Sequence, residues 1–305
     1  MDNNRETAMK YRIILTLIVA TAIVLPLSAG VKINGVGIEY ASIQTAVFNA
    51  VSGDTLIVTT GVYHEAVNIY GKDIALDGGY LPDYSAKAGW NSVIDGPWFM
   101  LNGPGSVIDI TNATVTLRDL DITDGGFSFA TPSGYGGGLD IRDGCVVTAE
   151  TCYIYGNTCK GHGGGVYVYE SELVFEDTAV DGNIAYDGLM ASSRGGGVYV
   201  GNGAFNARGA TSDIENNYAT SGGGIYGSRA HVRVSDNADV EGNTAVDRGG
   251  GIYVENDSLC EVTGNLSVIG AKKNSVTNGS GGGIYAADST VRDRKSTRLN
   301  SSHYS

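Results

Sequence analysis

The sequence predicts an all-β solenoid, a coil of stacked repeats closed at its N-terminal end by a short helix. Two observations lead to this fold class. Six glycine triplets recur at steps of 27, 32, 27, 27 and 32 residues, and a branched aliphatic residue follows each triplet. A period in this range is typical of solenoids, in which each repeat buries its apolar face against its neighbours. The triplets begin at Gly136, Gly163, Gly195, Gly222, Gly249 and Gly281.

Each triplet opens a predicted strand whose side chains alternate between two faces. The first residue after the triplet is aliphatic and the third is small or aliphatic, so both are expected to face inward. The second residue then faces outward. It is Asp140 once and a tyrosine in the other repeats, namely Tyr167, Tyr199, Tyr226, Tyr253 and Tyr285. Because successive strands lie ~4.8 Å apart, these tyrosines are expected to form an outward aromatic row.

An asparagine follows each of the first five triplets, with an aliphatic residue or alanine three positions before it. Asparagine tolerates left-handed backbone and hydrogen-bonds locally, so we expect it at a corner and stacked into a ladder. One repeat is then one turn of the coil, with a strand, a corner, a strand and a corner. The longer steps are expected to carry inserted loops at 185–194 and 264–273. The asparagines are Asn157, Asn183, Asn217, Asn243 and Asn274.

The glycine triplet, its aliphatic and tyrosine or aspartate successors, and the downstream asparagine motif together resemble the repeats of polymorphic outer-membrane proteins. More broadly, they are similar to the right-handed parallel β-helix group, which includes adhesins and polysaccharide lyases. The resemblance covers residues 31–291. It implies a right-handed parallel β-helix that is secreted or held at the cell surface, including the outer membrane where a C-terminal anchor follows.

Residues 1–29 are expected to be a signal peptide. Lys10 and Arg12 precede an apolar run at 13–25, and Ala29 ends a small-residue cleavage site. An uncleaved membrane anchor is the alternative, but the run is shorter than the ~17–25 residues needed to span a bilayer.

Residues 30–79 are expected to form the N-terminal cap and the first coils. A short amphipathic helix is predicted at 40–51, with Ser42 as its N-cap and Gly53 as its stop signal. Strands follow it, and the helix would cover the apolar interior and unpaired strand edges at the solenoid's end. The residues that share the apolar helix face are Ile43, Val47 and Ala50.

Residues 80–292 are expected to form the β-helix repeats, beginning with an excursion that contains Trp90. The basic, glycine-free string at 293–305 then breaks the array in mid-coil. It looks like the translation of a sequencing-library adapter, so we expect an artefactual tail and exclude it from the fold.

The formal charge of −13 repels nucleic acid and anionic membranes, so neither is an expected partner, except for membrane contact through the export signal or a C-terminal anchor. No cofactor is predicted; calcium would be needed only to bridge the protein to an acidic pectin. Export permits disulfides, and the alternative is that the cysteines are buried small apolar residues. The cysteines are Cys145, Cys152, Cys159 and Cys260.

No catalytic or metal-binding set is predicted. His162 lies in a Gly-His-Gly sequence like that of polygalacturonases, but the accompanying carboxylates are lacking, so a corner residue is expected. Arg118, Asp119 and Asp121, with Asp124 beyond, are similar to the arginine and calcium-binding carboxylates of pectate lyases. Solvated charges on the outside of a coil are the simpler interpretation.

The candidate binding site is therefore the tyrosine row at positions 167, 199, 226, 253 and 285. It would offer a platform to flat sugar faces or to a partner's strand, and the alternative is that the rings only stabilise the coil. We expect an exported, adhesin-like module that binds polysaccharide or a surface protein. A pectin-type lyase or esterase with an atypical site is the second interpretation, and a structural surface spacer is the third.

Overall fold

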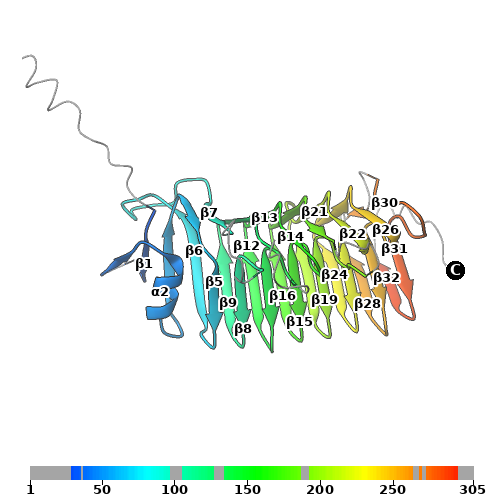
Figure 1. The fold of residues 1–305 in the computed structure, drawn as a ribbon, viewed down its shortest axis with the longest axis horizontal. Helices are drawn as coiled ribbons and strands as arrows, with labels where there is room; N and C mark the ends of the chain where they lie inside the picture. Colours follow the sequence, from blue (N-terminus) through cyan, green and yellow to red (C-terminus); the bar gives the residue numbers. More distant parts are fainter. Residues whose placement is uncertain are drawn as a thin grey trace, which may run out of the picture.

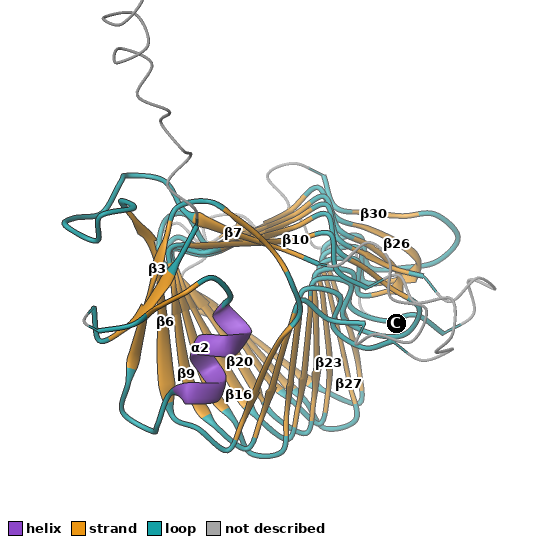
Figure 2. Ribbon diagram, turned by 60° about the vertical axis from the view of Figure 1, so that its left-hand side comes forward, coloured by secondary structure: helices purple, strands orange, loops and turns teal. Residues whose placement is uncertain are grey.

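The computed structural model describes residues 29–35, 37–96, 105–126, 134–186, 192–263, 268–269 and 273–294. They form an elongated solenoid whose strands run across its long axis (Figure 1). Three sheets, A, B and C, form the walls of the coil, and a fourth, sheet D, lies outside them (Figure 2). Residues 1–28 of the expected signal peptide and 295–305 of the expected tail lie outside the described residues.

Each sheet gathers equivalent strands from successive turns of the chain. Sheet A contains β1 (Val31–Ile33), β2 (Glu39–Tyr40), β3 (Thr55–Thr59), β6 (Ile74–Tyr80), β9 (Thr114–Arg118), β12 (Val146–Glu150), β16 (Glu172–Glu176), β20 (Ala204–Arg208), β24 (His231–Ser235), β28 (Leu259–Thr263) and β32 (Thr290–Arg294). Sheet B contains β4 (Val62–His64), β7 (Ser92–Asp95), β10 (Leu120–Thr123), β13 (Tyr153–Tyr155), β17 (Ala179–Asp181), β21 (Asp213–Glu215), β25 (Asp239–Glu241) and β29 (Val268–Ile269). Sheet C contains β5 (Val67–Tyr70), β8 (Ile108–Thr111), β11 (Leu139–Arg142), β15 (Val166–Tyr169), β19 (Val198–Gly201), β23 (Ile225–Ser228), β27 (Ile252–Glu255) and β31 (Ile284–Ala287). Sheet D contains β14 (Thr158–Cys159), β18 (Ile184–Ala185), β22 (Tyr218–Ser221), β26 (Thr244–Arg248) and β30 (Ser275–Val276).

Each regular turn of the chain visits sheets C, A, B and D in that order, for example through β15, β16, β17 and β18. The expectation of two strands per repeat is therefore wrong. Strands of sheets B and D are as short as two or three residues, and so short a segment shows too little alternation to be recognised in the sequence.

The apolar interior follows the predicted register. Val198 pairs with Ile225, Ile225 pairs with Ile252, and all three side chains are fully buried. These residues stand in one column of the core, which confirms the interior predicted from the position after each triplet.

The predicted asparagine ladder is also present. Asn183 Nδ2 donates to the Oδ1 of Asn217 and to the carbonyl oxygen of Ile154, both at 3.0 Å. The same pattern continues through the five buried asparagines. The ladder asparagine was expected to be the left-handed corner residue, and this detail is wrong. The left-handed residue is the one before it, such as Asn216 with φ of 55° or Gly182 with φ of 63°.

Each glycine of a triplet has its own reason to be glycine, as the third triplet shows. Gly195 has a φ of +64°, which favours glycine. A Cβ on Gly196 would lie 2.4 Å from the carbonyl oxygen of the next triplet and 2.5 Å from the backbone of Tyr218 in sheet D. A Cβ on Gly197 would lie 2.9 Å from Asn217 Nδ2. The triplet therefore makes room for sheet D and for the asparagine ladder.

The predicted cap is confirmed as helix α2 (Ile43–Asn49), which lies across the N-terminal end of the coil (Figure 2). The Ser42 hydroxyl accepts from the amide of Thr45 as the N-cap. Glu65 accepts from the amides of Ile43 and Gln44 at 2.7 and 2.9 Å, so a carboxylate from the first coil fixes the helix in place. The helix is shorter than predicted because its flanking residues, including Ala50, are extended.

The last described strand crosses the boundary expected at residue 292. In β32, Asp293 pairs with Val262 and Arg294 pairs with Thr263, so these two residues continue sheet A rather than leave it.

Candidate functional site

The tyrosine row lies on the outer face of sheet C, one ring per strand. Tyr167 and Tyr199 stack with ring centroids 4.9 Å apart and planes at 6°, and Tyr199 and Tyr226 stack at 5.4 Å and 8°. Tyr226 and Tyr253 meet edge to face at 5.0 Å. The predicted stacking is therefore confirmed, and aromatic pairs in these geometries stabilise the packing of neighbouring coils.

The row is not the open platform that the sequence suggests. Tyr226 is fully buried, and Tyr167, Tyr199 and Tyr253 are at most 8% exposed, while Tyr285 is partly buried. The expectation of exposed rings is wrong because the chain of sheet D, and the residues that link it to the next triplet, fold back over the outer face of sheet C. His162 is one such residue, and its ring stacks on Tyr199 at 4.9 Å.

Arginines lie over several of these rings. The guanidinium of Arg194 lies 5.1 Å from the ring centre of Tyr226, and that of Arg248 lies 5.4 Å from the ring centre of Tyr285. A guanidinium on an aromatic face is held by cation–π attraction. Two rings of the row, the buried Tyr226 and the partly buried Tyr285, therefore each support a guanidinium group.

The aspartate that replaces the first tyrosine of the row is also buried. Asp140 is 3% exposed and forms an ion pair with Arg142, whose guanidinium lies over the rings of Tyr135 and Tyr167. Burial raises the pKa of Asp140 to about 6, against the opposing effect of Arg142.

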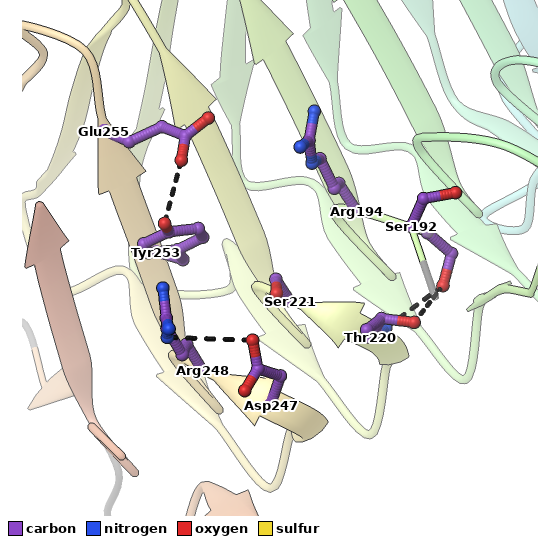
Figure 3. Close-up of a pocket in the computed structure, with 9 residues that line it drawn as sticks. Ser192, Arg194, Thr220, Ser221, Asp247, Arg248, Tyr253 and Glu255 are labelled. Carbon is purple, nitrogen blue, oxygen red and sulfur yellow. Dashed lines mark hydrogen bonds and ion pairs between the residues drawn. The ribbon is translucent and has the colours of Figure 1, made fainter. Parts of the chain in front are cut away.

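A polar pocket of about 210 Å³ opens beside the C-terminal part of the row (Figure 3). It lies where the ends of the sheet D strands approach β27. It is lined by Ser192, Ser193, Arg194, Thr220, Ser221, Asp247, Arg248, Tyr253 and Glu255.

The pocket floor is ordered by the same coil-to-coil pairing that builds the solenoid. Arg194 pairs with Ser221, and Ser221 pairs with Arg248, so the three residues occupy successive rungs. The hydroxyls of Ser193 and Thr220 lie 2.9 Å apart, and the amide of Thr220 donates to Ser193 Oγ at 3.1 Å. These pairings and hydrogen bonds connect Ser193, Arg194, Thr220, Ser221 and Arg248 across neighbouring coils.

Glu255 accepts hydrogen bonds from two tyrosines of the row. Tyr253 Oη donates to one carboxylate oxygen at 2.8 Å, and Tyr226 Oη donates to the other. Burial, and then the bond to Glu255, raises the pKa of Tyr253 to about 12, and the same two causes raise the pKa of Tyr226. Both phenols thus remain protonated donors at neutral pH, and Glu255 is already occupied as an acceptor.

The sequence was compared with models of known protein families, with curated proteins and with solved structures. A family model described as right handed beta helix region matches residues 137–304. The chain belongs to this right-handed β-helix family. No curated protein and no solved structure matches it. The family match and the parallel solenoid together confirm the predicted fold class.

The charged residues that resemble a lyase site are each engaged by another partner in the β-helix. Arg118 Nε donates to Glu150 at 2.6 Å, and Lys87 Nζ forms an ion pair with Asp119 at 2.7 Å. Asp121 accepts from Asn91 at 2.8 Å. Asp119 occupies a left-handed corner with φ of 49°, whereas Asp121 stands on the outer face of β10. None of these residues lines the pocket. Within the described ranges, no three His, Cys, Asp or Glu side chains gather closely enough to bind a metal ion.

The cysteines follow the second of the two interpretations. All four are buried free thiols, and burial raises the pKa of Cys152, Cys159 and Cys260 to about 12. They pack as small apolar residues of the β-helix. In the part of the chain that the structure describes, no helix has the length and apolar character required to cross a membrane.

The pocket arginines were not predicted, although the sequence carries a signal for them. Arg194 and Arg248 each stand directly before a glycine triplet. The residues at this position are Tyr135, His162, Arg194, Ser221, Arg248 and Ser280, and only their variability distinguishes them from the uniform positions after the triplet.

Proposed function

We propose that this right-handed β-helix is exported and acts as a surface-facing module that binds carbohydrate in the polar pocket. The observation that carries the proposal is the pair of guanidinium groups that lie over the rings of Tyr226 and Tyr285, beside serine and threonine hydroxyls and two carboxylates. Sugar hydroxyls both donate and accept, and this pocket offers fixed partners of both kinds.

The balance of charges also suits a saccharide. Arg194 and Arg248 face Asp247 and Glu255, so the lining has no large excess of either charge. Its polar groups are set by the coil itself, through the rung pairing of Arg194, Ser221 and Arg248. A preorganised site loses little side-chain entropy when a ligand binds. A sugar that makes several weak contacts can therefore still bind with a net gain in free energy.

Binding is favoured over turnover because the groups that would do chemistry are engaged. Glu255 is occupied by two tyrosine hydroxyls, and the raised pKa values of these phenols keep them protonated at neutral pH, so that neither is available as a general base. A lyase or esterase would require an acid–base pair within reach of the ligand. The proposal of export and of a secreted or cell-surface location is supported by the signal-like residues 1–29.

A glycan-binding assay with a matched control tests this function. We expect purified protein to retain immobilised polysaccharide, and Arg194→Ala or Arg248→Ala to weaken retention by about tenfold. Arg208→Ala is the control, since Arg208 pairs with Glu176 on sheet A and lies outside the pocket. Loss of retention only in the pocket variants, with no release of unsaturated uronides or acyl groups, supports a binding module. Product release would favour the enzyme, and no retention of any glycan would favour the spacer.

A further inference from the structure

The residues before the glycine triplets form a row that runs along the solenoid axis over the tyrosines. Isolated bridges and strand register join His162 to Arg194, Arg194 to Ser221, Ser221 to Arg248 and Arg248 to Ser280. In Figure 3 the side chains of Arg194 and Arg248 extend in the same direction, with Ser221 between their bases. We propose that this row binds a linear acidic polysaccharide whose acidic sugars alternate with neutral ones. The proposal rests on the carbohydrate-binding function above and specifies its ligand.

The alternation follows from the order of residues along the row. From Arg194 onward, a cationic side chain occupies every second rung and a serine hydroxyl occupies the rung between. Neighbouring rungs lie ~4.8 Å apart, so the two guanidinium groups repeat at about 9.6 Å along the axis. An extended disaccharide has a similar length. A chain lying along the row would therefore present one acidic sugar to each arginine and a neutral sugar to the serine between them.

The arginines are available to an external anion. Among the described residues, the contact recorded for the Arg194 guanidinium is with the ring of Tyr226, which is not an anion. Arg248 Nε lies 3.6 Å from Asp247 Oδ2, and both side chains are about half exposed, so water and salt screen this pair strongly. A ligand carboxylate or sulfate can accept hydrogen bonds from a guanidinium in a bidentate manner, which is stronger than the existing long contact.

A polymer that is acidic at every sugar fits less well. Its additional charges would stand over Ser221 and near Glu255, where the described structure provides hydroxyls and a carboxylate rather than a cation. The net charge of −13 also repels a dense polyanion over longer distances. A neutral polymer would offer neither guanidinium group an anionic partner of its own.

Binding to three immobilised polysaccharides at matched chain length tests the proposal. The probes are hyaluronan, in which uronic acid alternates with a neutral sugar, polygalacturonate, which is acidic at every sugar, and neutral dextran. We expect hyaluronan to bind at least about tenfold more tightly than either of the others, and less tightly as salt is raised. Arg194→Gln and Arg248→Gln should each remove most of this preference, while Arg208→Gln on sheet A should leave it unchanged.

A gain of function makes the test sharper. Ser280 is exposed and pairs with Arg248, so Ser280→Arg places a new cation one rung from Arg248 and breaks the alternation. This variant should bind polygalacturonate about tenfold more tightly than the unaltered protein does, and so reduce the difference in affinity between polygalacturonate and hyaluronan.

Equal affinity of the unaltered protein for the two acidic polymers overturns the inference. If dextran binds equally well and still depends on the pocket arginines, the carbohydrate-binding function stands and only the alternation fails. If no polysaccharide binds, both fall.

Discussion

Replacement of Asn217 by alanine should destabilise the solenoid more than any change on its surface. The Asn217 side chain is fully buried and all of its hydrogen-bonding capacity is used. Its Nδ2 donates to the carbonyl oxygen of Val180 and to Asn243 Oδ1, both at 3.0 Å. Its Oδ1 accepts from the backbone amide of Asn183 at 2.9 Å and from Asn183 Nδ2 at 3.0 Å.

The size of the effect follows from what Asn217→Ala leaves behind. The backbone amide of Asn183 loses its acceptor inside the protein, which costs about 2 kcal/mol. Asn183 Nδ2 and Asn243 Oδ1 each lose one hydrogen bond but keep a second, and the carbonyl oxygen of Val180 loses the bond from Asn217 Nδ2; each of these three losses costs about 1 kcal/mol. We therefore expect the free energy of unfolding to fall by about 5 kcal/mol, a large share of the ~5–15 kcal/mol typical of a folded domain.

Urea unfolding followed by circular dichroism measures this change, and hydrogen exchange at the Asn183 amide localises it. Asn216→Gly is the matched control, because Asn216 is exposed and its φ of 55° suits glycine. Its effect should stay below about 1 kcal/mol. Asn217→Asp keeps the shape but points an oxygen at two acceptors, so it should be as damaging as alanine at neutral pH and partly recover in acid, where the protonated acid can donate. If Asn217→Ala and Asn216→Gly differ by less than about 1 kcal/mol, the ladder does not hold the coil as argued.

Two further perturbations address the buried aspartate and the glycine triplet. Because burial raises the pKa of Asp140 from 3.8 to about 6, the folded protein binds its proton more tightly than the unfolded chain, and stability falls as pH rises from about 4 to about 6. Relative to Asp140→Asn, the unaltered protein should therefore lose about 3 kcal/mol of stability between acid and neutral pH in thermal or urea unfolding, and parallel pH profiles would contradict this. Gly196→Ala should destabilise by about 3 kcal/mol or more in the same assay, since its Cβ would lie 2.4–2.5 Å from two backbone atoms. Gly134→Ala, whose Cβ would lie 4.0 Å from the nearest atom of the described residues, should change little, and equal effects at the two sites would refute the steric account.

The parts of the fold that the sequence predicts are those set by contacts between equivalent positions in neighbouring coils. Ile225 is apolar because Val198 and Ile252 flank it in the core, and Asn217 is asparagine because Asn183 and Asn243 flank it in the ladder. Such contacts repeat with the coil, so they appear in one sequence as periodicity. The N-terminal helix is predictable for a different reason, because its Ser42 cap is a local signal.

The burial of the tyrosines was missed because it depends on contacts between non-equivalent positions, such as Arg194 over Tyr226 and His162 on Tyr199, rather than on contacts between equivalent positions in neighbouring coils. Whether Tyr226 faces water is decided by Arg194 and the neighbouring chain of sheet D, which fold back onto the outer face of sheet C. Nothing in the alternation around Tyr226 marks this cover, and a strand as short as Ile184–Ala185 has no readable pattern of its own. Alternation distinguishes the two faces of a strand, but it does not reveal whether the outer face is covered.

The position before each triplet is where this fold can vary its chemistry at the least structural expense. The first glycine of a triplet is required by its positive φ, the second by the close approach of sheet D, and the third by the asparagine ladder. The residue after the triplet must be apolar because it lies in the core. At the preceding position the constraint falls on the backbone: the amide of Gly222 donates to the carbonyl oxygen of Arg248 at 2.9 Å, whatever side chain residue 248 carries. Arginine, serine, histidine and tyrosine all occur there along one row. The coil therefore presents a line of side chains at regular intervals whose identities can change without disturbing its core, and ligand specificity in this protein is expected to reside in that line.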